Sequence, residues 1–361
     1  MGNGRNFVRW TLLATAAGAA IFFFWGRRYW SPKTEVRVSC ERIRLSNFPF
    51  HYEHWKEERL FQLRNQENFP EILGRNQFEY FLKLCDWTHR QWQRSVPDPY
   101  PLSNAIDILA DIRSRKTGGF CGQYAYVLAD VLKSLGFFAV RYVELWNNSG
   151  ESHFVVEAWS DQHQKWAILD PDNNLFYEIE ENGRPAAALE VRDSLFGGKP
   201  VRAKMADRPG ESLGRKKVDL YANFAISLRS DLMRHRRPLT VGDRFEMFLF
   251  FRDDHTDRKI FNGRIPYANV TSRREDIDYG CNQVRVEYRL EGRDVMLSFF
   301  TDGSMPNFRC FMVSLDNGKK WQRSDDRYRI PYRPGPLELW ISPLNWQSRF
   351  GSVTRANVLF H

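Results

Sequence analysis

Apolar positions recur every three or four residues in three stretches of the chain, which is the spacing of an amphipathic helix. This pattern predicts helices over residues 78–87, 105–112 and 121–135. A proline-rich segment from Pro97 to Pro101 closes the first of them, since proline interrupts helical hydrogen bonding. Residues 31–75 lack such a period and are expected to form irregular or short elements.

Short apolar runs bounded by turn residues follow the third helix. They predict strands over residues 138–146, 152–160 and 165–170. Residues 147–150 (NNSG) and 161–164 (DQHQ) lie between these strands and are expected to form turns. A helix that leads into an antiparallel sheet predicts an α+β core.

The pattern changes in the last part of the chain. A helix and a polar connector are expected within residues 186–215, and short strands dominate after that. The sequence predicts strands over residues 245–250, 283–288, 295–300, 308–315 and 337–341. Their spacing is typical of a β-sandwich, which we expect to be immunoglobulin-like. The expected domains are therefore 1–30, 31–215 and 216–361.

The first thirty residues contain an uncharged apolar run. Residues 10–26 carry no charge and have arginines on both sides, which leaves the orientation open. Hydrophobicity continues from Ile21 to Trp25, beyond the small-residue site at which a cleavable signal would end. We expect an uncleaved membrane anchor with the body outside the cytoplasm, in the periplasm or at the cell surface. A buried core helix is the alternative.

Charge and aromatic content narrow the class of partner. The formal net charge of +9 favours anionic surroundings such as phospholipid or acidic polysaccharide. No nucleic-acid-binding motif accompanies this charge, so nucleic acid is not an expected partner. The 12 Trp, 14 Tyr and 28 Phe suit large cores and partner-facing surfaces, but they identify no ligand.

The cysteines and histidines indicate no metal site or cofactor. There are five cysteines, and Cys281 and Cys310 both lie in strand-like segments of the C-terminal third, so a disulfide between them is left open. His51 and His54 have helical ligand spacing but no further ligand nearby in the sequence. The acidic run 253–257 lacks the glycine and distal glutamate of a calcium-binding EF-hand.

Cys121 has the sequence setting of a nucleophile. It follows Gly118 and Gly119 and begins a predicted helix. Backbone N–H groups and the helix dipole favour a thiolate at that end. The glycines permit close approach of another backbone or of a substrate, and a free N–H there suits an oxyanion. A buried, inert cysteine is the alternative.

His153 and Asp170 lie where a base and its partner are expected. His153 begins a strand after a turn that contains Gly150, and Asp170 ends the next strand. If these strands form a hairpin, the two side chains lie side by side. A carboxylate beside the imidazole fixes its tautomer and stabilises the imidazolium. A structural histidine and a turn-forming aspartate are the alternatives.

These residues together carry a family resemblance. Residues 119–125 (GFCGQYA) resemble the nucleophile helix of transglutaminase-like proteins. Residues 152–159 (SHFVVEAW) and 165–171 (KWAILDP) are similar to the histidine and aspartate strands of that superfamily. The resemblance covers residues 116–172, with the order Cys, His, Asp.

The resemblance implies a papain-like fold and acyl-transfer chemistry. Cys121 is then the nucleophile, His153 the general base and acid, and Asp170 the residue that orients the imidazole. The thiol attacks a glutamine carboxamide or a peptide carbonyl, releases ammonia or an amine, and leaves a thioester. Water or a lysine amine then resolves this intermediate.

Some positions depart from the pattern. Val155 stands two residues after the histidine, where an aromatic residue is common in the family. Arg115 lies six residues before the cysteine, so the oxyanion-binding glutamine of papain-like proteases is missing. Trp87 or Trp92 is a candidate replacement, with packing as the alternative role. Glu157 is expected to be a structural hydrogen-bond partner.

Two functions fit the sequence. The first is a thiol-dependent protease, amidase, deamidase or transamidase that acts on a protein or peptide substrate. The second is a catalytically silent transglutaminase-like scaffold that mediates protein or polysaccharide interactions in the cell envelope. The complete set of Cys121, His153 and Asp170 favours the enzyme.

Overall fold

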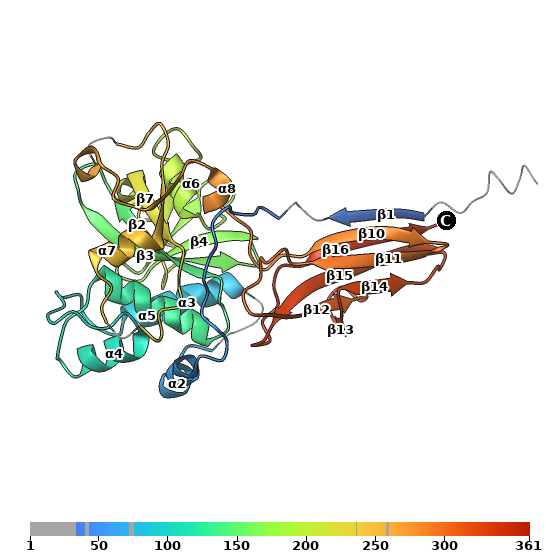
Figure 1. Cartoon of the computed structure of the whole chain (residues 1–361), viewed down its shortest axis with the longest axis horizontal. Helices are drawn as coiled ribbons and strands as arrows, with labels where there is room; N and C mark the ends of the chain where they lie inside the picture. Colours follow the sequence, from blue (N-terminus) through green and yellow to red (C-terminus); the bar gives the residue numbers. More distant parts are fainter. Residues whose placement is uncertain (1–33, 40–42, 72–75, 236, 258–259) are drawn as a thin grey trace, which may run out of the picture.

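The chain folds into an α+β body and a β-sandwich that lie side by side (Figure 1). The computed structural model describes residues 34–39, 43–71, 76–235, 237–257 and 260–361. The α+β body contains the predicted nucleophile helix and hairpin, and the sandwich extends away from it.

An eight-stranded sheet forms the centre of the α+β body. Its strand order is β6-β5-β4-β3-β2-β7-β8-β9, and neighbours pair antiparallel except for β8 and β9, which are parallel. In that order the strands span Val201–Met205, Leu175–Ile179, Lys165–Asp170, Ser152–Ser160, Val140–Trp146, Asn223–Ser227, Phe248–Phe251 and Asn269–Thr271. The hairpin expected over residues 152–170 is confirmed by the pairing of β3 with β4.

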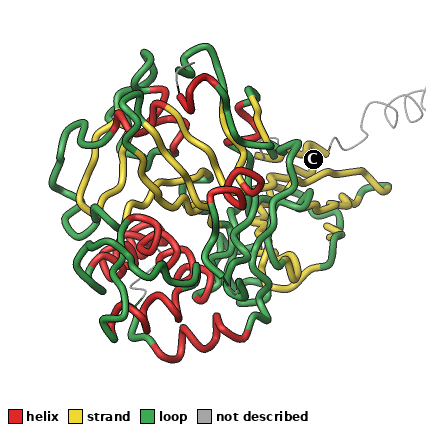
Figure 2. The backbone as a smooth tube through the Cα atoms, turned by 60° about the vertical axis from the view of Figure 1, so that its left-hand side comes forward, coloured by secondary structure: helices red, strands yellow, loops and turns green. Residues whose placement is uncertain are grey.

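Helices pack on this sheet and gather largely on one side of it (Figure 2). They span α2 (Glu58–Gln66), α3 (Gln77–His89), α4 (Ala105–Arg113), α5 (Cys121–Ser134), α6 (Ala188–Asp193), α7 (Val241–Met247) and α8 (Arg274–Ile277), with 3₁₀ turns at Val218–Ala222 and Ile260–Gly263. The predicted helices 78–87, 105–112 and 121–135 agree with α3, α4 and α5 to within two residues at each end.

Helix α5 is the most deeply buried helix among these. Every one of its residues is buried, and it packs against α2, α3 and α4 as well as β2 and β3. Its charged groups pair internally: Lys133 Nζ lies 2.7 Å from Asp130 Oδ1, and both side chains are fully buried. Because an unpaired buried charge is costly, this pairing is what allows the two charged side chains to lie in the core.

The sandwich consists of two sheets around one apolar core. The larger has the order β1-β16-β15-β12-β13 and the smaller β10-β11-β14. In that order the strands span Thr34–Ser39, Thr354–Phe360, Gly335–Asn345, Phe308–Ser314 and Gln322–Ser324, and then Arg285–Glu291, Asp294–Phe300 and Arg327–Ile330. Side chains such as Leu297 and Leu339 meet between the sheets. The finer description as immunoglobulin-like stays a prediction.

The strands do not follow the expected division at residues 215 and 216. Strands β7, β8 and β9 lie beyond residue 215 but extend the sheet of the α+β body, next to β2. Strand β1 lies before that division but pairs with β16 of the sandwich. Both differences arise from pairing between distant parts of the chain, which local hydrophobic patterns do not report.

One expected strand is partly a helix. Residues 245–250 were expected to be extended, but helix α7 runs to Met247 before β8 begins. A capping box explains the helix: the Asp243 N–H donates to Thr240 Oγ1 at 3.2 Å, and the Thr240 N–H donates to the Asp243 carboxylate at 2.8 Å. Such reciprocal bonds satisfy the free N–H groups at a helix start.

The N-terminal anchor and the disulfide have different outcomes. The predicted anchor, residues 1–30, lies outside the described residues and stays a prediction. Across the part of the chain that is described, no helix has both the length and the apolar character to cross a bilayer. Cys281 and Cys310 are buried free thiols, so the pairing left open by the sequence does not form here.

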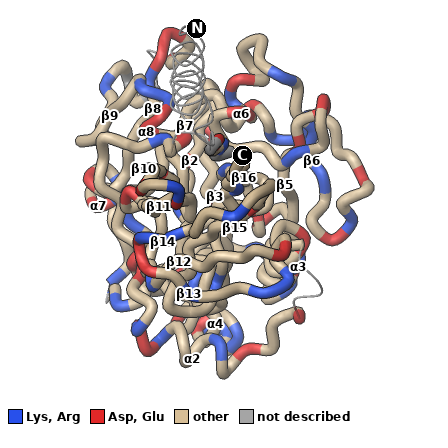
Figure 3. The backbone as a smooth tube through the Cα atoms, turned by 90° about the vertical axis from the view of Figure 1, so that its right-hand side faces the viewer, with Lys and Arg blue, Asp and Glu red and all other residues tan. Residues whose placement is uncertain are grey.

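Charged residues of both signs alternate along the backbone. Figure 3, viewed from the side of the sandwich, shows Lys and Arg positions interspersed with Asp and Glu positions. An anionic polysaccharide partner stays a prediction.

Asn345 joins the sandwich to the end of helix α5. Its Nδ2 donates to the Gly136 carbonyl at 2.9 Å, and its Oδ1 accepts from the N–H groups of Gln347 and Arg349 at 3.0 Å each. We expect Asn345→Ala to lower the free energy of unfolding by about 1–3 kcal/mol, since buried partners lose their bonds. Urea unfolding measures this, with the exposed Asn357→Ala as the matched control. Equal unfolding midpoints for the two variants would contradict the expectation.

Candidate active site

Cys121 stands at the first position of α5, where close packing requires the two preceding glycines. A Cβ added at Gly118 would overlap the Ser95 hydroxyl and the Val96 carbonyl, and one added at Gly119 would overlap Trp92. The glycines therefore leave room for the Trp92 ring, the Ser95 side chain and the Val96 carbonyl against the start of the helix. Cys121 itself is 9% exposed.

The helix start is held by side-chain hydrogen bonds. The Phe120 N–H donates to Gln123 Oε1 at 3.2 Å, and Trp92 Nε1 donates to the Gly119 carbonyl at 3.3 Å. Because its indole N–H is occupied, Trp92 acts by packing and positioning rather than as an oxyanion donor. Trp87 packs edge-on against Phe69, so packing also accounts for it.

His153 and Asp170 are hydrogen-bonded neighbours. His153 Nε2 lies 2.8 Å from Asp170 Oδ2, with both side chains buried. Asn173 holds the carboxylate in place: its Nδ2 donates to Oδ2 at 2.9 Å and its N–H donates to Oδ1 at 3.1 Å. The sequence expectation that these two side chains meet at one end of the hairpin is confirmed.

The pair is strongly polarised. Burial lowers the pKa of His153, but the Asp170 carboxylate and its hydrogen bond outweigh burial and raise the pKa to about 10. A hydrogen bond with Cys121 adds to this rise. Burial opposes ionisation of Asp170, yet His153 and Asn173 hold its pKa below the usual range. An ionised Asp170 only accepts, so Nε2 carries the proton in this bond.

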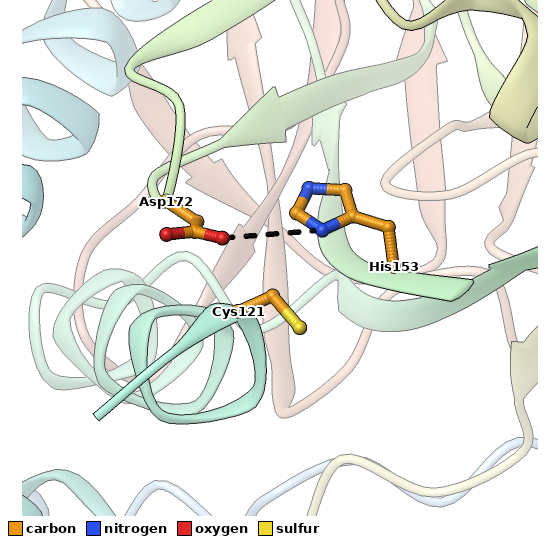
Figure 4. A group of neighbouring side chains, drawn as sticks. All are labelled: Cys121, His153 and Asp172. Atoms are coloured by element: carbon orange, nitrogen blue, oxygen red, sulfur yellow. Dashed lines mark ion pairs between the residues drawn. The ribbon is translucent and has the colours of Figure 1, made fainter. Parts of the chain in front are cut away.

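A second carboxylate, Asp172, lies on the other side of the imidazole. Its Oδ2 is 4.0 Å from His153 Nδ1 and 3.3 Å from Arg94 Nε. Donor atoms of Cys121, His153 and Asp172 all lie within 4.8 Å of one another. Figure 4 shows the thiol below the imidazole, with the Asp172 carboxylate facing it. Sequence reasoning missed this residue, although it stands only two positions after Asp170.

The thiol opens into a cleft of about 470 Å³. Its walls are mainly aromatic and apolar, formed by Tyr100, Phe120, Tyr126, Phe154, Leu239 and Val241. A Cβ added at Gly122 would lie 3.2 Å from the Tyr100 hydroxyl, so that hydroxyl stands over the first turn of α5. Burial raises the pKa of Tyr100 and keeps it a hydrogen-bond donor. No sequence signal identified this tyrosine.

An ion pair forms the polar part of the cleft. Arg244 Nη1 lies 2.6 Å from Glu144 Oε1, and the Tyr267 hydroxyl donates to Glu144 Oε2 at 3.0 Å. Burial raises the pKa of Glu144, and Arg244 opposes this effect. The pair adds charged hydrogen-bonding groups to a cleft whose walls are mainly aromatic and apolar.

Other candidate groups have structural roles. Glu157 accepts from Arg141 Nε and from the Ala188 N–H, each at 2.7 Å, as expected of a structural partner. A larger cavity of about 1280 Å³ borders the acidic run 253–257. Its described lining contains neither cysteine nor histidine, and Asp253 there pairs with Arg192.

Comparison with known proteins agrees with this geometry. Residues 72–171 match the family model of the transglutaminase-like superfamily. This part of the chain contains Cys121, His153 and Asp170, and it is similar to that superfamily, whose members are typically cysteine-based enzymes. Asp172 lies one residue beyond the match. No curated protein matches the chain.

The His153 pair makes the stability of the fold depend on pH. The folded pKa of about 10 exceeds the ordinary value of about 6.5, so protonated His153 stabilises the folded state. This stabilisation is complete below pH ~6.5 and is lost as pH rises through about 10. We expect the unfolding free energy of the wild type minus that of His153→Gln to fall over this range.

Urea unfolding at several pH values measures this difference. The same subtraction with the exposed His54→Gln serves as the control, because it removes a histidine outside the site. A difference that stays constant or grows between pH ~6.5 and ~10 would show that His153 is not held as an imidazolium.

Proposed function

We propose that this protein is a thiol enzyme that transfers or hydrolyses an acyl group through a thioester on Cys121. The observation that carries the proposal is the His153–Asp170 hydrogen bond of 2.8 Å beside a cysteine at the start of a buried helix. A base held by a buried carboxylate and placed beside a thiol is the arrangement that nucleophilic catalysis needs.

The reaction follows from the orientation of the imidazole. Asp170 holds Nε2–H, which leaves Nδ1 to take the proton of the Cys121 thiol. The thiolate attacks the carbonyl carbon of a carboxamide or peptide bond. As the C–N bond breaks, His153 returns the proton to the leaving nitrogen, and a thioester remains. Water or an amine then attacks the thioester, gives its proton to His153, and the thiol is restored.

Tyr100 supports the charge that develops in this reaction. Attack turns the carbonyl oxygen into an oxyanion, which needs preorganised donors. The N–H groups at the start of α5 and the Tyr100 hydroxyl above Gly122 both border the cleft. We propose that the Tyr100 hydroxyl is the oxyanion donor, a role for which Trp92 was a candidate.

The cleft favours a peptide segment as the acyl donor. Its volume of about 470 Å³ and its aromatic walls suit an extended segment of about one or two residues. The Glu144–Arg244 pair offers hydrogen bonds to the peptide backbone or to a carboxamide. The substrate is accordingly a protein or peptide. This class of substrate suits a membrane-anchored enzyme whose body lies outside the cytoplasm, as we propose for this chain. The silent scaffold is the alternative outcome of the tests below.

The reactivity of Cys121 tests the thiol–imidazole pair. We expect iodoacetamide to alkylate Cys121 at pH ~6 at least about tenfold more slowly in His153→Ala than in the wild type, because the imidazolium stabilises the thiolate. Peptide mass spectrometry measures the rate at Cys121. His54→Ala is the control and should match the wild type. Equal rates in His153→Ala and the wild type would leave the scaffold as the function.

Tyr100 provides a test of turnover. With a casein digest as the substrate pool, and with dansylcadaverine as the added amine, mass spectrometry reports hydrolysis, deamidation and amine incorporation. We expect Tyr100→Phe to lower kcat by about 10²–10³, which is the usual loss for one oxyanion donor, with little change in KM. Tyr288→Phe, at an exposed position of β10, is the control. An unchanged kcat in Tyr100→Phe would exclude this role.

A further inference from the structure

We propose that Cys121, His153 and Asp172 form a binding site for a thiophilic divalent cation of the zinc class, which silences the nucleophile when bound. The proposal concerns the same thiol as the proposed function. It rests, however, on ligand geometry and is tested by binding rather than by turnover.

The three side chains present a suitable donor set. Their thiolate, imidazole and carboxylate are the groups that bind zinc in proteins. They come from the start of α5, the start of β3 and the turn after β4, and their donor atoms lie within 4.8 Å of one another. The hard cations Ca²⁺ and Mg²⁺ prefer oxygen ligands, so a site with sulfur and nitrogen selects against them.

The surroundings of His153 match those of a metal-binding histidine. Such a histidine usually donates its second ring N–H to a carboxylate, which orients the ring and makes the free nitrogen a better ligand. Asp170 provides this bond at 2.8 Å, and Asn173 in turn donates to Asp170. Nδ1 is then directed at the space between Cys121 and Asp172.

Asp172 is the feature that the proton-transfer mechanism does not use. Its side chain is 3% exposed, and its Oδ1 is buried with no hydrogen-bond partner among the described residues. A divalent cation would supply positive charge that offsets the cost of burying this carboxylate.

Arg94 is the group with which a cation would compete. Its Nε lies 3.3 Å from Asp172 Oδ2, but its side chain is 63% exposed and can turn into solvent. Three protein ligands leave a fourth position, which suits water. Binding releases the Cys121 thiol proton and any proton on Nδ1 to solvent. The cation then occupies the lone pairs that proton transfer and attack require.

The experiment titrates the purified full-length chain with Co²⁺, whose thiolate complexes absorb light, and then displaces Co²⁺ with Zn²⁺. We expect one equivalent to bind to the wild type and the thiolate absorption to be absent in Cys121→Ser. Asp172→Asn should bind at least about tenfold more weakly, the loss expected when a ligand or its support is removed. Zn²⁺ should also slow the alkylation of Cys121 in the wild type.

Matched controls separate the site from adventitious binding. Cys310→Ser removes a buried thiol of the sandwich, and Asp111→Asn removes a carboxylate on α4; both should bind Co²⁺ as the wild type does. Circular dichroism checks that each variant is folded. Equal affinity in Asp172→Asn and the wild type overturns the three-ligand site, as does failure of Zn²⁺ to protect Cys121.

The outcomes of the cation titration and of the casein turnover assay are independent of each other. Cation binding without casein turnover supports this site and rejects the proposed enzyme. Turnover without cation binding supports the enzyme and rejects this site.

Discussion

The complete burial of helix α5 is the constraint on which the rest of the site depends. A helix enclosed on all sides must pair its charged groups internally, and Asp130 and Lys133 do so at 2.7 Å. Asp130 also accepts the Ala105 N–H at 2.8 Å, which ties the start of α4 to the middle of α5. The position of Cys121 at the start of this helix is therefore set by core packing and not by a surface loop.

The same packing brings the hairpin to the thiol. Near the C-terminal end of α3, a ring nitrogen of His89 lies 3.0 Å from the Pro171 carbonyl, and Asn174 donates to Asp86 at 2.9 Å. These contacts fix the turn after β4, which carries Asp170 and Asp172. Helix α5 and the turn after β4 both pack against α3. A shift in α3 would therefore move the carboxylates relative to His153.

The sequence predicted those parts of the protein whose signals are local. Helix α5 and strands β3 and β4 agree with the predicted bounds closely, because periodicity, glycines and turns lie within each segment. The meeting of His153 with Asp170 followed from a simple hairpin. The sheet membership of β7 and the pairing of β1 with β16 were not predictable, because they depend on distant partners. Tyr100 and Asp172 were missed for the same reason.

Two carboxylates lie on opposite sides of the His153 imidazole, Asp170 at Nε2 and Asp172 near Nδ1. Asp170 binds Nε2 and makes Nδ1 more basic, which benefits a proton acceptor and a metal ligand equally. Asp172 faces the other side, where it takes no part in the proposed proton transfer and is the third ligand of the proposed cation site. In the proposed cation site, Arg94 is the competitor of the cation, because its guanidinium neutralises Asp172 only while it stays on that carboxylate. Loss of this ion pair would leave the site more anionic and would favour cation binding over proton transfer.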